Sequence, residues 1–213
     1  MALLMGILVV NAGSSSLKLR VLDDDAVAGG VDLPPPRDAA DVDALAAAIA
    51  SLGPVNAVGH RIVHGGTLFS GPVLIDAAVE EQIRSLTDLA PLHQPKSLAA
   101  LDAVSAALPG VPAVACFDTA FHATISSAAS TYALPSSWRQ RWALRRYGFH
   151  GLSHAYASER AASLLGVTGG FRVVTCHLGA GASLAAVLDG KSADTTMGLP
   201  DPLGAHDSLI ATL

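Results

Sequence analysis

The chain has few cysteines, few charged residues and no long uninterrupted apolar segment. Cys116 and Cys176 are the two cysteines in 213 residues, and each lies near the end of a short apolar run, which is typical of buried, reduced thiols. No apolar segment is long enough to cross a bilayer, and the apolar N-terminus lacks the basic region of an export signal. The sequence therefore argues against a disulfide scaffold and a membrane-spanning protein, and it predicts a cytoplasmic location.

Basic residues are also scarce. The net charge is −5, and no run of lysine and arginine offers a track for a nucleic-acid backbone, so a general nucleic-acid binder is not expected. An apolar fraction of 51% with 15% charged residues is typical of a tightly packed globular protein. The length suffices for one large domain or two small ones.

Strand and helix signals alternate along the chain, which predicts an α/β fold. Three strands at 6–12, 17–22 and 27–32 are expected to open it as a β-meander. Helices are predicted at 39–52, 76–87, 95–108 and 154–165, and further strands at 57–63, 111–116, 171–176 and 184–188. Ligands of open α/β sheets bind near strand ends, so the polar residues that follow these strands are candidates for a site.

Two glycine-containing turns follow apolar strands. The first, Asn11–Lys18, combines Gly13, three serines and a terminal lysine, so hydroxyls, backbone N–H groups and a positive charge can surround a phosphate. The second, His177–Ser183, leads into another strand. The first turn alone is equally consistent with a plain hairpin, and the second alone is more typical of a tight turn. Together they predict two related lobes that hold a phosphorylated ligand at a common point.

Three polar residues are candidates for binding an anion or for catalysis. Arg61 lies inside an otherwise apolar strand, where a guanidinium is costly unless it meets a carboxylate or phosphate. Asp118 follows the strand at 111–116, either as an active-site carboxylate or as a turn cap. His150 precedes a glycine, either as a hydrogen-bond donor or as a packing residue.

Two histidine pairs have the four-residue spacing of zinc hydrolases, His60 with His64 and His150 with His154. The β-branched residues within the first pair favour a strand, and no glutamate lies within either pair to activate water. We expect structural histidines that hydrogen-bond to the backbone, with a zinc hydrolase as an alternative.

Six segments, in this order along the chain, closely resemble the acetate kinase family. They are Asn11–Lys18, Gly59–Gly66, Ala90–His93, Phe117–His122, Arg145–Gly151 and His177–Ser183. The resemblance runs from the first strand to about Gly198, and the family's proteins are much longer. The chain is therefore similar to an amino-terminal portion of such a protein.

The resemblance implies the ribonuclease-H-like lobes of the acetate and sugar kinase, chaperone and actin superfamily. Residues 1–120 would form the first lobe, and 121–213 part of a second, nucleotide-binding lobe. The implied activity is the reversible transfer of the γ-phosphoryl group of ATP to acetate, giving acetyl phosphate and ADP. Mg²⁺ or Mn²⁺ would assist, and the family is homodimeric.

The resemblance also implies roles for matching residues. The catalytic residues would be Arg61, Asp118 and His150. Contacts to the nucleotide or its phosphates would come from Ser14, Ser16, Lys18, His177, Gly179, Ala180 and Gly181. Substrate contacts would come from Arg61, Val63, Leu92 and His93, with Val63 and Leu92 forming a small methyl pocket that favours acetate, and the metal contact from Asn11.

Two departures from the family pattern affect these expectations. Ala180 stands where the family usually has asparagine, which removes a side-chain donor. After Gly198 the sequence drifts from the family, whose second catalytic arginine, adenine pocket and metal-binding glutamate come later. We therefore expect weak or no turnover from these 213 residues alone. A propionate kinase and a non-catalytic binder of nucleotide or acetyl phosphate are the alternatives.

Overall fold

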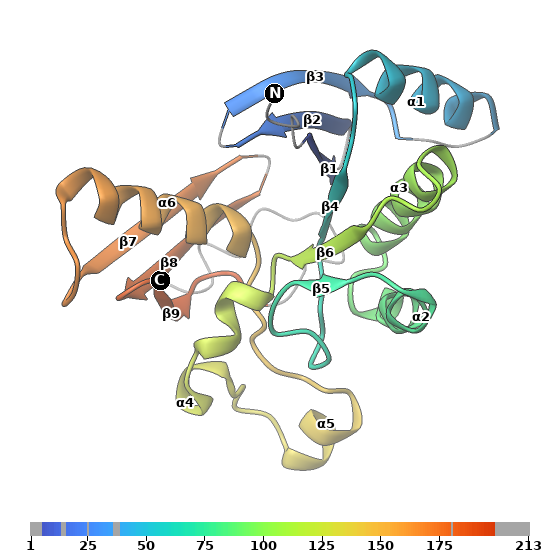
Figure 1. Cartoon of the computed structure of the whole chain (residues 1–213). Helices are drawn as coiled ribbons and strands as arrows, with labels where there is room; N and C mark the ends of the chain where they lie inside the picture. Colours follow the sequence, from blue (N-terminus) through green and yellow to red (C-terminus); the bar gives the residue numbers. More distant parts are fainter. Residues whose placement is uncertain (1–5, 14–15, 25, 36–38, 180, 199–213) are drawn as a thin grey trace. The chain divides into compact units, whose positions relative to one another are not determined.

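A computed structural model describes residues 6–13, 16–24, 26–35, 39–179 and 181–198 (Figure 1). The chain divides into two compact units, each described here by itself. Unit 1 comprises residues 1–63 and 72–116, and unit 2 comprises residues 64–71 and 117–213.

Unit 1 contains a mixed sheet whose described strands have the order β3-β2-β1-β4-β6-β5. The strands are β1 (Ile7–Ala12), β2 (Leu17–Asp23), β3 (Ala26–Leu33), β4 (Ala57–Ile62), β5 (Val73–Leu74) and β6 (Ala113–Phe117). The first three are joined antiparallel, which confirms the predicted meander, and β4 pairs parallel with β1. The short β5 was not predicted; it pairs antiparallel with β6.

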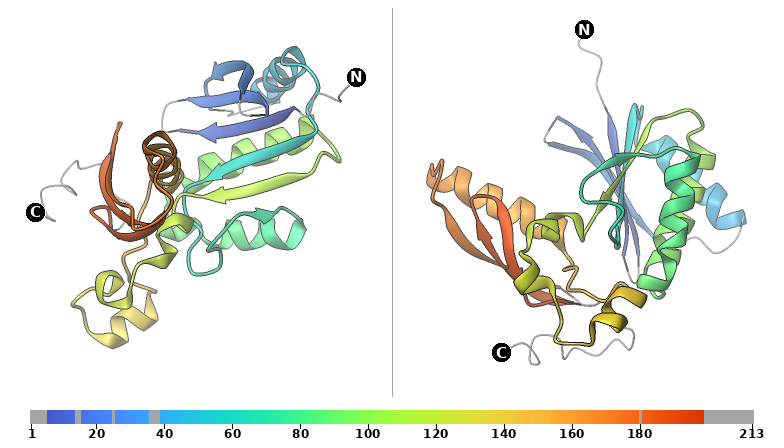
Figure 2. Two further views of the ribbon diagram at one scale, coloured as in Figure 1. Left: turned by 60° about the vertical axis from the view of Figure 1, so that its left-hand side comes forward. Right: turned by 90° about the horizontal axis from the view of Figure 1, so that it is seen from below.

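Helices cover one face of this sheet (Figure 2). The helices of unit 1 are α1 (Ala39–Ser51), α2 (Ala77–Ser85), the 3₁₀ turn η1 (Thr87–Leu89) and α3 (Gln94–Ala107). Leu8, Leu17 and Leu19 of the sheet are fully buried in one core with residues of α1 and α3. Burial of each such side chain stabilises the fold by about 1.5–3 kcal/mol. Because side chains alternate along a strand, the intervening positions of β1, β2 and β4 project from the opposite face.

Unit 2 contains the antiparallel sheet β7-β8-β9. Its elements are η2 (Ala120–Thr124), α4 (Ser127–Ser130), α5 (Ser136–Arg141), α6 (Gly151–Leu165), β7 (Arg172–Leu178), β8 (Ala182–Leu188) and β9 (Lys191–Thr195). Helix α6 packs against β7. Asp189 and Gly190 both have positive φ in the turn between β8 and β9, as a tight two-residue hairpin requires.

Several boundaries in unit 2 differ from the sequence prediction, and strand β8, for example, begins at Ala182 instead of residue 184. Helix α6 begins three residues early, at Gly151, because His150 has left-handed backbone angles and serves as its N-cap. Strand β7 runs to Leu178, so His177 belongs to the strand and pairs with Ser183 instead of starting the turn. The short helices α4 and α5 and strand β9 gave no recognisable sequence signal. Among the described residues, no helix is both long enough and apolar enough to span a membrane.

The β7-β8 sheet has an exposed apolar face. Val174, Leu178 and Leu188 are 64%, 79% and 44% exposed, and the register places them on one face, whereas Thr175 and Ser183 are buried on the other. Cys176 is exposed and Cys116 half-buried, so the prediction of two buried thiols is wrong. An uncovered apolar sheet face favours association.

We expect residues 1–213, produced as such, to self-associate at micromolar concentration through this face. Val174→Thr combined with Leu188→Thr should shift the chain toward monomer, because both changes keep β propensity and remove apolar surface. Sedimentation equilibrium measures the shift. The control is Leu164→Gln, which removes a 71% exposed leucine from α6 and should leave association unchanged. A monodisperse wild-type monomer would contradict the prediction.

Candidate active site

A row of polar residues crosses the sheet of unit 1. Asn11 of β1 lies opposite Lys18 of β2 and opposite Arg61 of β4. Directly paired residues share a face of the sheet, so the three side chains project from the face that α1 and α3 leave uncovered. Arg61 Nη1 donates to Asn11 Oδ1 at 3.1 Å. The row therefore presents an amide, a guanidinium and an ammonium group side by side.

Burial differs along this row. Lys18 is exposed, whereas Asn11 and Arg61 are half-buried. The half-buried guanidinium of Arg61 donates one of its five N–H groups to the amide oxygen of Asn11. Two cationic groups on one face of a sheet favour an anionic ligand.

The turn between β1 and β2 is closed by a hydrogen bond from Gly13 N to the Ser16 carbonyl oxygen at 2.8 Å. This turn makes a hairpin of β1 and β2, and Ser16 is half-buried in it. Ser14 lies outside the described residues. Phosphate binding by this turn remains a prediction.

The expected substrate residues lie near the end of β4 and before α3. Val63 follows β4 and is buried. Leu92 is 50% exposed, and His93 is the half-buried N-cap residue of α3. The methyl pocket predicted from Val63 and Leu92 remains a prediction.

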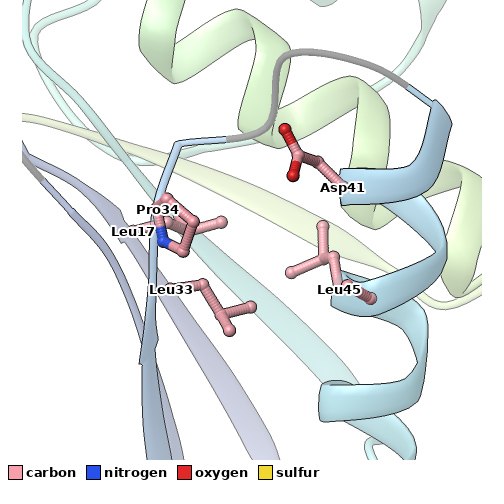
Figure 3. Close-up of a pocket in the computed structure, with 6 residues that line it drawn as sticks. Leu17, Leu33, Pro34, Asp41 and Leu45 are labelled. Carbon is pink, nitrogen blue, oxygen red and sulfur yellow. The ribbon is translucent and has the colours of Figure 1, made fainter.

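A small hollow lies between α1 and the β2-β3 strands (Figure 3). It has a volume of about 30 Å³ and is lined by Leu17, Leu33, Pro34, Asp41, Ala44 and Leu45. Ligand pockets for small molecules measure about 300–1,000 Å³, so this hollow is far too small for a nucleotide.

In unit 2, tight backbone packing holds Asp118 next to the start of α6. Asp118 is 2% exposed and directly follows β6, as predicted. Its carbonyl oxygen accepts a hydrogen bond from Gly151 N at 3.0 Å. A Cβ at Gly151 would lie 2.0 Å from that oxygen, so only glycine fits there. His150, the residue before Gly151, is thereby held close to Asp118.

His150 has a φ of 57°, a left-handed conformation that is uncommon for a non-glycine residue. Its Nδ1 lies 2.9 Å from Ser183 Oγ, and its ring stacks on His177 with centroids 4.0 Å apart. A Cβ at Gly181 would lie 3.3 Å from His150 Nε2, so this edge of the ring borders the β7-β8 turn. The turn is closed by Gly179 N donating to the Gly181 carbonyl oxygen at 3.0 Å. The structure thus brings together His150, His177, Gly179 and Gly181; Ala180 lies outside the described residues.

His122 fixes the carbonyl group that precedes His150. Its Nε2 lies 3.0 Å from the Phe149 carbonyl oxygen, and its Nδ1 lies 2.8 Å from Ser192 Oγ. A carbonyl oxygen only accepts, so Nε2 carries the proton and Nδ1 accepts from the Ser192 hydroxyl. In a similar way, His64 Nδ1 accepts from Gly66 N at 2.8 Å. For His64 and His122, the prediction of structural histidines bonded to the backbone is confirmed.

Four histidines are held neutral by burial. Desolvation lowers the pKa of His64, His122 and His154 in unit 2, and of His60 in unit 1, from 6.5 to about 4. Both ring nitrogens of His154 contact hydroxyls: Nδ1 lies 2.8 Å from Thr175 Oγ1 and Nε2 lies 2.8 Å from Ser183 Oγ. Neither nitrogen is then available for the zinc site considered for the His150–His154 pair.

Hard oxygen donors suit a magnesium ion better. Mg²⁺ usually binds one or two carboxylates together with substrate phosphates and waters. In unit 1, Asn11 Oδ1 is an oxygen donor of that kind. Among the described residues, no group of three or more histidine, cysteine, aspartate or glutamate side chains could hold a metal ion. A single side-chain oxygen such as that of Asn11 fits a metal that is held largely by a phosphorylated ligand.

Sequence reasoning missed the hydroxyls that contact the imidazoles, which are Thr175, Ser183 and Ser192. The four-residue spacing of His150 and His154 was a usable signal, since it places both rings on one side of the helix start. A serine or threonine on a strand gives no comparable signal, because its partner depends on the packing of α6 on the sheet.

The family is established by comparison with known proteins. The acetokinase family model matches residues 39–205. The chain is 43% identical to an acetate kinase of Methanosarcina barkeri, across 91% of this chain and 56% of that protein. Its fold is similar to a solved acetate kinase of Porphyromonas gingivalis and a solved propionate kinase of Francisella tularensis. Each has a TM-score of 0.81 at 35% identity, across 92% of this chain and 58% of the other.

These likenesses define an α/β fold shared with acetate and propionate kinases, and the predicted fold class is confirmed. The chain belongs to the acetokinase family. It spans 56% to 58% of the length of the relatives named above.

Gly148 tests how tightly the segment before His150 is held. Its φ is 79°, and an added Cβ would lie 2.4 Å from His122 Cγ. Gly148→Ala should therefore cost both backbone strain and a collision with the His122 ring. The matched control is Gly190→Ala, where φ is 75° and nothing lies within 4 Å. We expect the control to lose about 1 kcal/mol and Gly148→Ala about 1–3 kcal/mol more, measured by urea unfolding. Equal losses would contradict the packing described.

The buried histidines predict a loss of stability at mildly acidic pH. Their folded pKa values of about 4 lie below the unfolded value of 6.5, so the unfolded chain binds more protons between these limits. Stability is therefore complete above pH 6.5 and falls as the pH falls toward 4. Each histidine removes up to about 1.4 kcal/mol per pH unit in this window. Urea midpoints at about pH 7.5 and about pH 5 measure the loss; equal midpoints would contradict it.

Proposed function

We propose that this chain provides part of an acetate kinase, which reversibly transfers the γ-phosphoryl group of ATP to acetate, giving acetyl phosphate and ADP. The observation that carries the proposal is the polar row of unit 1, in which Arg61 donates to Asn11 opposite Lys18. Membership of the acetokinase family supports the same activity. We assign the two lobes to residues 1–120 and 121–213.

Arg61 and Lys18 have complementary roles in this proposal. The planar guanidinium of Arg61 binds a carboxylate or the transferring phosphoryl group through two parallel N–H donors. The ammonium group of Lys18 attracts phosphate oxygens as a point charge. Phosphoryl transfer depends on positioning the reactants and on stabilising charge at the transferring oxygens, and it requires little covalent chemistry from the protein. Val63 and Leu92 form the walls of the pocket for the acetate methyl group, and His93 follows Leu92 in the sequence.

Residues of unit 2 complete the proposed set. Asp118 orients the reacting group, and His150 donates a hydrogen bond to the transferring phosphoryl group from a fixed backbone position. The β7-β8 turn, with His177, Gly179, Ala180 and Gly181, contacts the nucleotide phosphates, as do Ser14 and Ser16. Mg²⁺ or Mn²⁺, bound with ATP and contacting Asn11, supplies charge neutralisation at the phosphates. A homodimer and a cytoplasmic location belong to the same proposal.

A propionate kinase is the second candidate, because a solved propionate kinase has the same fold at the same identity as the acetate kinase compared above. A small methyl pocket favours acetate. Calorimetric titration with acetyl, propionyl and butyryl phosphate distinguishes the two acids, since it requires binding and no turnover.

Arg61 is the residue that tests the proposed function most sharply. We expect wild-type residues 1–213 to bind acetyl phosphate in calorimetry, and Arg61→Ala to weaken binding about tenfold to a hundredfold, because hydrogen bonds to a charged group contribute about 1.5–3 kcal/mol. Arg61→Lys should recover part of the affinity, since it restores the positive charge but not the two parallel N–H donors of the guanidinium.

Arg20→Ala is the matched control. Arg20 lies two residues from Lys18 on the same face of β2, and its Nη2 is 2.7 Å from Asp32 Oδ1 at the surface. Exposed ion pairs contribute little, so acetyl phosphate affinity should stay within about twofold of wild type. Absence of wild-type binding heat, or equal losses in both alanine variants, would count against the proposal.

A further inference from the structure

Three hydrogen bonds connect four side chains in a row, from Thr175 in the interior of unit 2 to His150. Thr175 Oγ1 lies 2.8 Å from His154 Nδ1, His154 Nε2 lies 2.8 Å from Ser183 Oγ, and Ser183 Oγ lies 2.9 Å from His150 Nδ1. Thr175, His154 and Ser183 are 5%, 1% and 0% exposed. Water therefore has little access to the three inner groups, and each hydroxyl depends on the neighbours named.

The direction of these hydrogen bonds follows from counting protons. The Thr175 hydroxyl has one proton, and within the described residues His154 Nδ1 is its hydrogen-bond partner. A buried hydroxyl that does not donate is costly, so Thr175 donates to Nδ1. Neutral His154 then carries its proton on Nε2 and donates to Ser183. Ser183 therefore donates its hydroxyl proton to His150 Nδ1.

The reverse direction leaves a donor unused. If His150 Nδ1 donated to Ser183, then Ser183 would donate to His154 Nε2, and His154 Nδ1 would donate to Thr175. The buried Thr175 hydroxyl would then have no acceptor among the described residues. One unmade buried hydrogen bond disfavours this arrangement by about tenfold or more.

We propose that Thr175, His154 and Ser183 are positioning residues that hold His150 as the neutral tautomer with its proton on Nε2. This edge of the ring borders Gly181 in the β7-β8 turn. An N–H at this edge attracts a phosphoryl oxygen, whereas the lone pair of the other tautomer would repel it. The tautomer itself rests on the contacts above. Its importance for phosphoryl transfer rests on the proposed function of His150.

Nitrogen NMR of the protein with isotope-labelled histidine tests the tautomer directly, because protonated and unprotonated ring nitrogens have well-separated chemical shifts. At about pH 7.5, wild-type His150 should show a protonated Nε2 and an unprotonated Nδ1. A protonated His150 Nδ1 in the wild type would overturn the proposal, and this measurement needs no variant.

Substitutions then test the hydrogen-bond relay that Thr175, His154 and Ser183 form. Thr175→Val preserves shape but removes the first donor, so both histidines should become mixtures of tautomers, whereas Thr175→Ser should keep the wild-type pattern. Ser192→Ala is the matched control, because it removes a buried serine–histidine contact, with His122, outside the relay. His150 should be unchanged in it. An unchanged His150 tautomer in both Thr175→Val and Ser183→Ala would overturn the positioning role.

A titration with acetyl phosphate separates this inference from the proposed function. We expect Thr175→Val to weaken acetyl phosphate binding about twofold, because the binding-competent tautomer of His150 falls to about half of the molecules, and Ser192→Ala to have no effect. If Thr175→Val shifts the tautomer but leaves affinity unchanged, the relay stands and the role of His150 in anion binding is overturned.

Discussion

The Ser183 hydroxyl lies between two imidazoles, and much of unit 2 depends on this arrangement. Ser183 belongs to β8, and His150 and His154 belong to the start of α6, so the shared hydroxyl joins helix to sheet. The Ser183 hydroxyl contacts a ring nitrogen of each imidazole, and burial keeps His154 neutral. Each hydrogen bond in this network is fixed in direction, because each hydroxyl has only one proton to donate.

The histidine network and the glycines of segment 148–151 act together. Gly148 lies against the His122 ring and Gly151 against the Asp118 carbonyl oxygen, so the backbone of His150 has little freedom. His122 holds the Phe149 carbonyl oxygen from the other side. A left-handed residue persists only where its surroundings enforce it, and such conformations are concentrated at functional sites. The packing thus explains why the candidate donor is presented from an uncommon conformation.

Much of the fold followed from hydrophobic patterning. Strand and turn signals predicted the opening meander, and the alternation of buried and exposed residues in β1 and β2 places one face of it under α1 and α3. The same alternation places Lys18 and Arg61 with Asn11 on the opposite face, although the direct contact between Arg61 and Asn11 depends on the parallel register of β4, which no local pattern reveals. Short elements such as β5 and β9 were missed because two to five residues carry no readable period. The relay was missed for a different reason: Thr175 and Ser183 acquire partners only when α6 packs on the sheet.

Neutron diffraction from a deuterated crystal at neutral pH tests the central arrangement most directly, since it locates each exchangeable proton. The account predicts deuterium on His154 Nε2 and on His150 Nε2, with the Ser183 deuterium directed at His150 Nδ1. Deuterium on His154 Nδ1, with the Ser183 deuterium directed back at His154, would contradict it.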